Sequence, residues 1–281
     1  MSTCNHDCSS CSQKCSKQDL IEPQNKSSKI KRVIGVVSGK GGVGKSLVTS
    51  MLAVTMRRRG YNTAVLDADI TGPSIPKAFG LGRGIVEGNE LGMFPPLTST
   101  GIKTMSVNLL IDDETKPVVW RGPVISGVVK QFYTDVLWGE NDIAFIDMPP
   151  GTGDIHLSII NELKISGAVI VSTPQAVAVA DVVRGVEMFR YPQVNIPVLG
   201  VVENMAWFTP EELPNNRYYL FGKGGAARYA EEVGVDLLGE VPIIQDIMQG
   251  ADDGVPAVNT VSQVAEVYQQ IAQKVVDKMG K

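Results

Sequence analysis

The residues with the clearest chemical signature lie between positions 39 and 46. The sequence there fits the pattern G-x-x-x-x-G-K-[ST] in full. Glycines permit unusual backbone angles and leave room for amide groups to surround phosphate oxygens. In such a loop Lys45 reaches the β- and γ-phosphate oxygens, and the Ser46 hydroxyl binds Mg²⁺. We therefore predict a nucleotide site made of Gly39, Lys40, Gly41, Gly42, Val43, Gly44, Lys45 and Ser46. A glycine-rich turn that matches by chance is the alternative.

Acidic side chains follow two apolar runs further along the chain. Asp67 and Asp69 come at the end of one run, and Asp147 ends another. Side chains at the carboxyl ends of strands in an open α/β sheet meet the ligand crevice. We predict that Asp147 holds Mg²⁺, directly or through water, and that Asp67 belongs to the same site. Asp154 follows two glycines in a segment able to move when the γ-phosphate leaves. Any of these acids could instead cap a helix, Asp154 above all.

Four cysteines form a second candidate site, and the chain has no others. Cys4, Cys8, Cys11 and Cys15 have the spacing C-x₃-C-x₂-C-x₃-C, with His6 beside them. Thiolates held close together repel one another unless a cation neutralises them. A four-cysteine iron–sulfur cluster, with 4Fe–4S favoured, is one solution, and tetrahedral zinc is another. A tail of unligated or redox-active thiols is the third.

The phosphate loop needs a strand before it and a helix after it, and the sequence provides both. Residues 32–38 are a short β-branched apolar run, and residues 45–60 have the pattern of a helix that ends at Gly60. Apolar runs and helical patterns then alternate, which predicts a doubly wound, mostly parallel sheet in an α/β fold. The further strands are expected at 63–67, 102–109, 142–148, 168–172, 197–202 and 236–241, and the helices around 123–138, 154–164, 176–190, 224–233 and 260–279.

Composition and charge exclude several classes of protein. The chain has 281 residues, 43% hydrophobic and 20% charged, with a net charge of −4. No uncharged apolar stretch is long enough to span a membrane, and no signal sequence precedes the body, so we expect a cytoplasmic protein. The first 32 residues carry a net charge of +3, and the acidic remainder argues against nucleic-acid binding. We expect residues 1–31 to be a cysteine-rich tail and linker, and residues 32–281 to be one P-loop domain.

Lys40, the other lysine of the phosphate loop, carries a resemblance to a known class of protein. KGGVGKS resembles the deviant Walker A loop of the MinD/ParA/nitrogenase iron protein class of NTPases. The resemblance implies a homodimer that sandwiches the nucleotide, with Lys40 reaching across to the partner's nucleotide. It also implies that Asp69 orients the attacking water and that Asn204 reads the adenine. A solvent-facing Lys40 and a turn-forming Asn204 are the alternatives.

A closer resemblance covers the chain from about residue 32 to its end. It is similar to the Mrp/ApbC family of iron–sulfur cluster carrier ATPases in VVSGKGGVGKS, DADITGPS, VVWRGP, DMPPGTGD, STPQAVAVADVVRG, VVENM and FGKGG. This implies an ATP- and Mg²⁺-dependent carrier or assembly factor, with Lys40, Lys45 and Asp69 as catalytic residues. Its partners would be apo iron–sulfur proteins and assembly scaffolds, and hydrolysis would be slow and would gate cluster transfer.

The sequence departs from this family at one place. Many members carry C-x-x-C shortly after the ENM segment, but residues 206–222 contain no cysteine. A cluster that bridges a dimer there is not supported. Two other functions stay open. One is a MinD/ParA-like positioning switch on a membrane or DNA, although the last helix has few lysines on its polar face. The other is an ATP-binding scaffold whose tail takes zinc.

Overall fold

The fold is that of a computed structural model, which describes residues 21–70, 72–82, 84–110, 122–151, 153–256, 258 and 261–280. All four cysteines and His6 therefore lie outside the described residues. The predicted cysteine site therefore stays a prediction.

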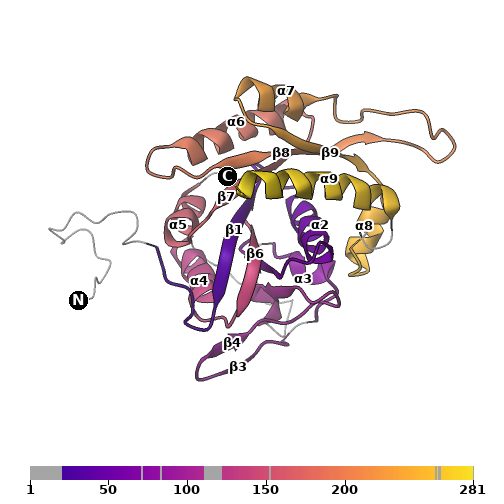
Figure 1. The fold of residues 1–281 in the computed structure, drawn as a ribbon. Helices are drawn as coiled ribbons and strands as arrows, with labels where there is room; N and C mark the ends of the chain where they lie inside the picture. The colour runs from indigo at the N-terminus through magenta and orange to yellow at the C-terminus, as the bar shows by residue number, and fades with distance from the viewer. Residues whose placement is uncertain are drawn as a thin grey trace.

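A parallel β-sheet forms the centre of the molecule (Figure 1). Within the described residues seven strands pair in the order β5-β2-β6-β1-β7-β8-β9, and every pairing is parallel. This order confirms the predicted doubly wound fold, because the chain moves outward from β1 first in one direction and then in the other. The strands are β1 (Lys29–Val37), β2 (Thr63–Asp67), β5 (Lys103–Met105), β6 (Glu140–Asp147), β7 (Gly167–Ser172), β8 (Val198–Phe208) and β9 (Leu237–Ile243).

Helices cover both faces of the sheet, and two hydrophobic cores lie beneath them. The first core receives side chains from α4 (Gly122–Thr134), α5 (Asp154–Glu162), α6 (Ala176–Arg190) and α7 (Gly225–Glu232). The second receives side chains from α2 (Lys45–Arg58), α3 (Ile75–Ala78), α8 (Gln245–Asp252) and α9 (Ser262–Met279). Successive residues of β1 point to opposite faces, so Val33 joins the first core and Ile34 the second.

The last helix, α9, packs one face on the second core. Val264, Tyr268, Ile271 and Val275 are all buried there, at the three- and four-residue steps that the sequence pattern predicted. Its apolar stripe is therefore used inside the molecule. In the described part of the chain, no helix is both long and apolar enough to cross a membrane.

Residues before the predicted boundary at residue 32 contact the sheet and its helices. Strand β1 starts at Lys29, which pairs with Glu140 of β6. Before it, the Glu22 amide donates to the Glu162 carbonyl at the end of α5, and the Glu22 carboxylate pairs with Lys130 of α4 at 2.5 Å. The Gln24 amide bonds the hydroxyl of Tyr133. Residues 22–28 thus form a strap along α4 and α5, and part of the predicted linker belongs to the domain.

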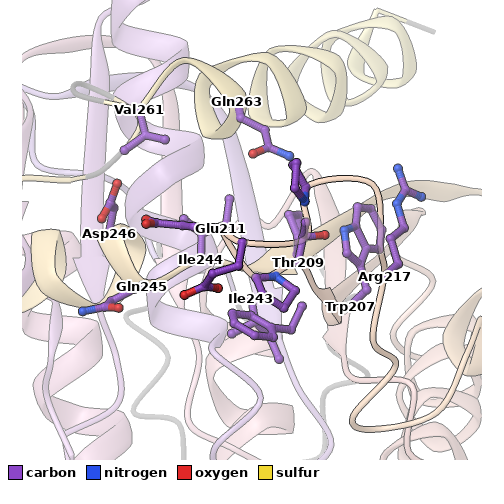
Figure 2. A pocket seen from close by; sticks show the side chains of 15 residues that line it. Trp207, Thr209, Glu211, Arg217, Ile243, Ile244, Gln245, Asp246, Val261 and Gln263 are labelled. Atoms are coloured by element: carbon purple, nitrogen blue, oxygen red, sulfur yellow. The ribbon is translucent and has the colours of Figure 1, made fainter.

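Two features were absent from the sequence-based prediction. A hairpin of β3 (Glu87–Asn89) and β4 (Gly92–Phe94) lies below the sheet, and its side chains are mostly exposed. Strand β8 continues to Phe208, whose backbone bonds that of Tyr218. The intervening loop forms one wall of a groove of about 720 Å³, closed by the end of β9 and the start of α9 (Figure 2). In that wall the Arg217 guanidinium lies 4.2 Å from the Trp207 ring centroid.

Candidate nucleotide site

The glycine-rich loop joins the end of β1 to the start of α2. Gly42 and Gly44 both have φ of 80°, a left-handed backbone conformation that residues other than glycine rarely adopt. Gly44 has a second reason to be glycine, since a Cβ there would lie 2.2 Å from the Asn204 amide nitrogen. The loop surrounds a cavity of about 290 Å³, which is lined by Ser38, Lys40, Gly41, Gly42, Val43, Gly44, Lys45, Ser46, Leu47, Asp69, Ser74 and Pro150. Of the predicted loop, only Gly39 is outside this lining.

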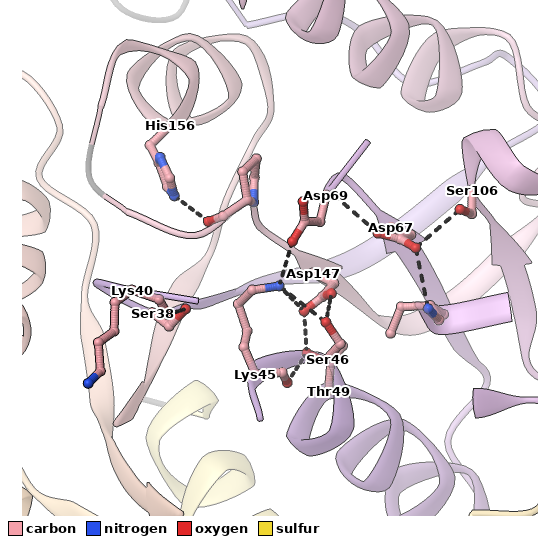
Figure 3. Close-up of polar contacts among 12 residues, drawn as sticks. Ser38, Lys40, Lys45, Ser46, Thr49, Asp67, Asp69, Ser106, Asp147 and His156 are labelled. Carbon is pink, nitrogen blue, oxygen red and sulfur yellow. Dashed lines mark hydrogen bonds and ion pairs between the residues drawn. The ribbon is translucent and has the colours of Figure 1, made fainter. Parts of the chain in front are cut away.

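Asp147, at the end of β6, is the centre of the polar contacts at the foot of the loop (Figure 3). Its Oδ1 lies 2.7 Å from the Lys45 Nζ and accepts a bond of 2.9 Å from the Thr49 hydroxyl. Its Oδ2 accepts a bond of 2.5 Å from the Ser46 hydroxyl. The carboxylate is fully buried, so its charge is balanced by one ammonium and two hydroxyl donors. The structure thus brings together Lys45, Ser46 and Asp147 as predicted, and adds Thr49.

The two acids of the DADITGPS segment have different surroundings. Asp69 lines the cavity, and its Oδ2 lies 3.9 Å from the Lys45 Nζ. Asp67 is fully buried behind it and accepts bonds from the Asp69 and Ile75 backbone amides and from the Ser106 hydroxyl. Burial, with the nearby Asp147 carboxylate, raises the pKa of Asp67 well above its usual range. Asp67 therefore supports the turn that carries Asp69, and it does not line the cavity.

Lys40 and Asn204 contact the chain itself on either side of the loop. The Lys40 Nζ donates to the Gln175 Oε1 at 3.0 Å, and Figure 3 shows this side chain directed away from Lys45 and Asp147. The buried Asn204 amide donates to the Val43 carbonyl at 2.9 Å and so braces the loop backbone. Gln175 lies in the STPQAVAVADVVRG segment, but the resemblance implied no role for it, so its contact with Lys40 is a finding of the structure.

The DMPPGTGD segment lies against the loop and is held there by His156. The Gly151 amide donates to the Ser38 carbonyl at 2.9 Å. The His156 Nε2 lies 2.7 Å from the Pro149 carbonyl, which can only accept, so this nitrogen carries the proton. Burial lowers the pKa of His156 below its usual range. Gly153 occupies the N-cap of α5, and Asp154 is the first helical residue. The N-cap position that was the alternative for Asp154 is therefore taken by Gly153.

This set of groups fits a magnesium-bound triphosphate. The loop offers backbone donors around a cavity, Lys45 offers a nearly buried positive charge, and Ser46 and Asp147 offer the oxygen ligands that Mg²⁺ prefers. Among the described residues no group of three or more His, Cys, Asp and Glu side chains could hold a metal ion. The protein alone thus supplies few magnesium ligands, as is usual where phosphate oxygens and water complete the shell.

The parallel sheet and the glycine loop with its buried Lys45–Asp147 pair define a P-loop NTPase. The comparison with known families is more specific, because the family described as "ParA: NUBPL iron-transfer P-loop NTPase" matches residues 29–276. The chain belongs to that family. The predicted recognition, fold class and assignment as a P-loop ATPase are thereby confirmed.

Individual relatives agree with this placement. The iron–sulfur cluster carrier protein of Methanocaldococcus jannaschii is 41% identical, and the match covers 99% of this chain and 98% of the relative. The iron–sulfur protein required for NADH dehydrogenase of Arabidopsis thaliana mitochondria is 44% identical over 88% of this chain and 78% of the relative.

Two solved structures show the same fold. The nucleotide-binding protein of Archaeoglobus fulgidus in complex with ADP is 42% identical, with a TM-score of 0.71 over 80% of this chain and 87% of that one. The cell division ATPase MinD of Pyrococcus furiosus has a TM-score of 0.65 over 88% of this chain and 99% of that one. At 21% identity it shares the fold alone.

Proposed function

We propose that this protein is an ATPase that carries iron–sulfur clusters, or helps to assemble them, for apo iron–sulfur proteins and scaffolds. The observation that carries the proposal is the buried contact of Lys45, Ser46 and Thr49 with Asp147 at the foot of the glycine loop. It supports an ATP site in a chain whose family transfers iron. Curated relatives that match almost its full length are named as cluster carriers.

Each residue of the site has a role in this proposal. The loop amides and Lys45 bind the phosphates, and Ser46 with Asp147 holds Mg²⁺, which would neutralise the developing phosphate charge. Asp69, on the cavity wall, orients the attacking water, and Asp67 fixes the turn that carries it. Asn204 keeps Val43 in place. The adenine contact predicted for Asn204 would use its carbonyl oxygen and its second N–H.

The working unit that we propose is a homodimer with nucleotide between the subunits. Lys40 supports this, because its ammonium bonds Gln175 and is directed away from Lys45 and Asp147 of its own subunit. A second subunit facing the loop could receive this charge at its own nucleotide, as an arginine finger is received. Hydrolysis would then depend on association, and we expect it to be slow.

The cargo in this proposal is bound by the tail. Cys4, Cys8, Cys11 and Cys15 supply four thiolates, the ligand set of a 4Fe–4S cluster. Zinc on the same thiolates would make the protein an ATP-binding scaffold instead. In the described part of the chain the apolar stripe of α9 is buried on the core, so it gives no support to a membrane-docking role.

One experiment separates the two halves of the function. Lys45→Ala removes the buried ammonium beside the phosphates, and Cys8→Ser with Cys11→Ser removes two thiolates. We expect Lys45→Ala to weaken ATP–Mg²⁺ binding by about 100-fold or more and to abolish hydrolysis, since charge-assisted contacts are among the strongest polar ones. After anaerobic reconstitution it should still hold iron and sulfide, whereas the cysteine variant should lose both and bind ATP normally.

Calorimetry, phosphate release and quantification of iron and acid-labile sulfide measure these outcomes. Lys77→Ala is the matched control, because Lys77 is an exposed lysine of α3 that pairs with Asp252 away from the loop. Wild-type affinity in Lys45→Ala would contradict the nucleotide site. Zinc without sulfide in the wild type would contradict the cargo.

A further inference from the structure

Within the described residues the Lys40 ammonium makes one hydrogen bond, the 3.0 Å bond from its Nζ to the Gln175 Oε1, while the Lys40 carbonyl accepts a bond from the Ser38 hydroxyl. The lysine is half-buried and the glutamine lies at the start of α6. Lysine carries a flexible four-carbon stem, and an unrestrained ammonium would sample many positions. The bond to Gln175 restricts it to one of them.

Gln175 occupies a position where helix stability would favour another residue. It is the N-cap of α6, yet its side chain makes no capping hydrogen bond. Serine, threonine, aspartate and asparagine are the residues that cap well, and glutamine is not among them. The amide is thus used for Lys40 and not for the helix that begins beside it.

The turn that carries Gln175 is packed tightly against the FGKGG segment. A Cβ at Gly225 would lie 2.1 Å from the Pro174 carbonyl oxygen, so only glycine permits this approach. Gly225 begins α7, whose Ala226 amide donates to the Glu203 carboxylate at 2.6 Å. Glu203 is fully buried on β8, so it fixes the start of α7 against the sheet.

These contacts connect two points of the phosphate loop, Lys40 and Val43, to one packed unit. Glu203 is followed by Asn204, which holds the Val43 carbonyl, while Gln175 holds Lys40 three residues before Val43. Strand β7 precedes Gln175, strand β8 contains Glu203 and Asn204, and the two strands are adjacent in the sheet, where Ser172 is paired with Glu203. The position of the Lys40 ammonium is therefore set by the same elements that shape the loop.

We propose that Gln175 is a positioning residue for Lys40, which it holds directed out of its own nucleotide cradle and toward a second subunit. This inference rests on the proposed function, in which Lys40 acts across a dimer. A neutral amide suits the role, because it orients the ammonium without cancelling its charge. A carboxylate at position 175 would hold the lysine as an ion pair and would compete with the phosphate that it must reach.

The test compares Gln175→Ser and Gln175→Glu with wild type. The serine variant loses the bond to Lys40 but gains a good N-cap, so its melting temperature should be unchanged or higher. Its hydrolysis rate and ATP-dependent dimerisation should fall by about ten- to 100-fold, the order expected for a hydrogen bond to a charged group. The affinity for ATP–Mg²⁺ should stay within about twofold, because Lys40 is not directed at its own nucleotide. Gln175→Glu should lose more activity and should recover part of it as salt is added.

Two controls assign the outcome. Gln193→Glu makes the same chemical change at an exposed position and should leave hydrolysis unchanged. In a Lys40→Ala background, Gln175→Ser should cause no further loss. Full activity of both Gln175 variants, beside an inactive Lys40→Ala protein, would overturn the positioning role alone. Full activity of Lys40→Ala would overturn the proposed function of Lys40, and the role of Gln175 with it.

Discussion

At the scale of single residues, the site consists of charges that are buried only because they have partners. Asp147 and Lys45 neutralise one another inside the molecule, and Ser46 and Thr49 complete the acceptor positions of the carboxylate. The sequence pattern indicated Lys45, Ser46 and Asp147, because strand ends and a glycine loop restrict where such side chains can lie. It did not indicate Thr49, whose partner is 98 positions away, or Gln175, whose role depends on a contact 135 positions away.

His156 gives a pH dependence that belongs to this scale. Burial lowers its pKa in the folded protein, while the unfolded chain has an ordinary value of about 6.5. Below that value the unfolded state binds a proton that the folded state does not, so the free energy of unfolding falls as the pH falls. The stability that the neutral His156 gives to the folded protein is fully present above about pH 6.5. It is lost progressively as the pH falls toward the lowered pKa of the folded state.

We therefore expect wild-type stability to fall more steeply than that of His156→Gln between about pH 7.5 and 5.5. The glutamine amide can still donate to the Pro149 carbonyl but does not titrate. Urea denaturation at several pH values measures both slopes. Parallel curves for the two proteins would show that His156 is not held in its neutral form.

At the scale of elements, prediction succeeded where an element crosses the core. Strands β2, β6 and β7 are buried runs, and α6 has the bounds that its pattern indicated, because these segments contact the core on a regular period. The hairpin β3–β4 was not predicted, since its exposed, glycine-containing strands lack the alternation of apolar and polar residues that indicates a strand. Strand β1 begins three residues early because Ile30 is buried between charged neighbours whose side chains face solvent.

The packing of α7 leads to a prediction at this scale. Gly225→Ala places a methyl group 2.1 Å from the Pro174 carbonyl oxygen, so α7 or the start of α6 must shift. We expect a loss of about 1–3 kcal/mol in the free energy of unfolding, as for other overpacked sites. Gly127→Ala in α4 is the matched control, since its Cβ meets nothing within 4 Å.

In this helical control alanine should stabilise the protein by roughly 0.5–1 kcal/mol. Chemical denaturation of the two variants beside wild type measures both effects. Equal stability of Gly225→Ala and wild type would mean that the contact with Pro174 is not close.

At the scale of the whole molecule, the strap of residues 22–28 connects the N-terminal part of the described chain to the helices and the sheet. Glu22 joins it to Lys130 of α4 and Glu162 of α5, and Gln24 joins it to Ile30 of β1. Composition alone suggested a linker up to residue 31, because lysine and serine are frequent there. The contacts of the strap could not be predicted in this way, because single contacts of polar side chains with a distant helix leave no pattern in the sequence.

Two truncations test this boundary. Removal of residues 1–20 should leave the urea midpoint and ATP affinity of the body unchanged. Removal of residues 1–31 also deletes the strap and the first pairings of β1 with β6, and should lower the free energy of unfolding by at least about 2 kcal/mol, since each hydrogen bond is worth about 1 kcal/mol. Equal stability of the two truncated proteins would restore the boundary at residue 32.

Helix α5 has a mechanical consequence for this arrangement. It begins directly after the segment that lies on the phosphate loop, and the carbonyl of its last residue, Glu162, accepts the amide of Glu22. An α-helix of nine residues is only about 13 Å long and resists axial compression, because its hydrogen bonds run along the axis. A shift at the start of α5 would thus be transmitted over a very short path to Glu22 and the strap. A change at the phosphate loop would thus reach the strap through one short helix, without rearrangement of the sheet.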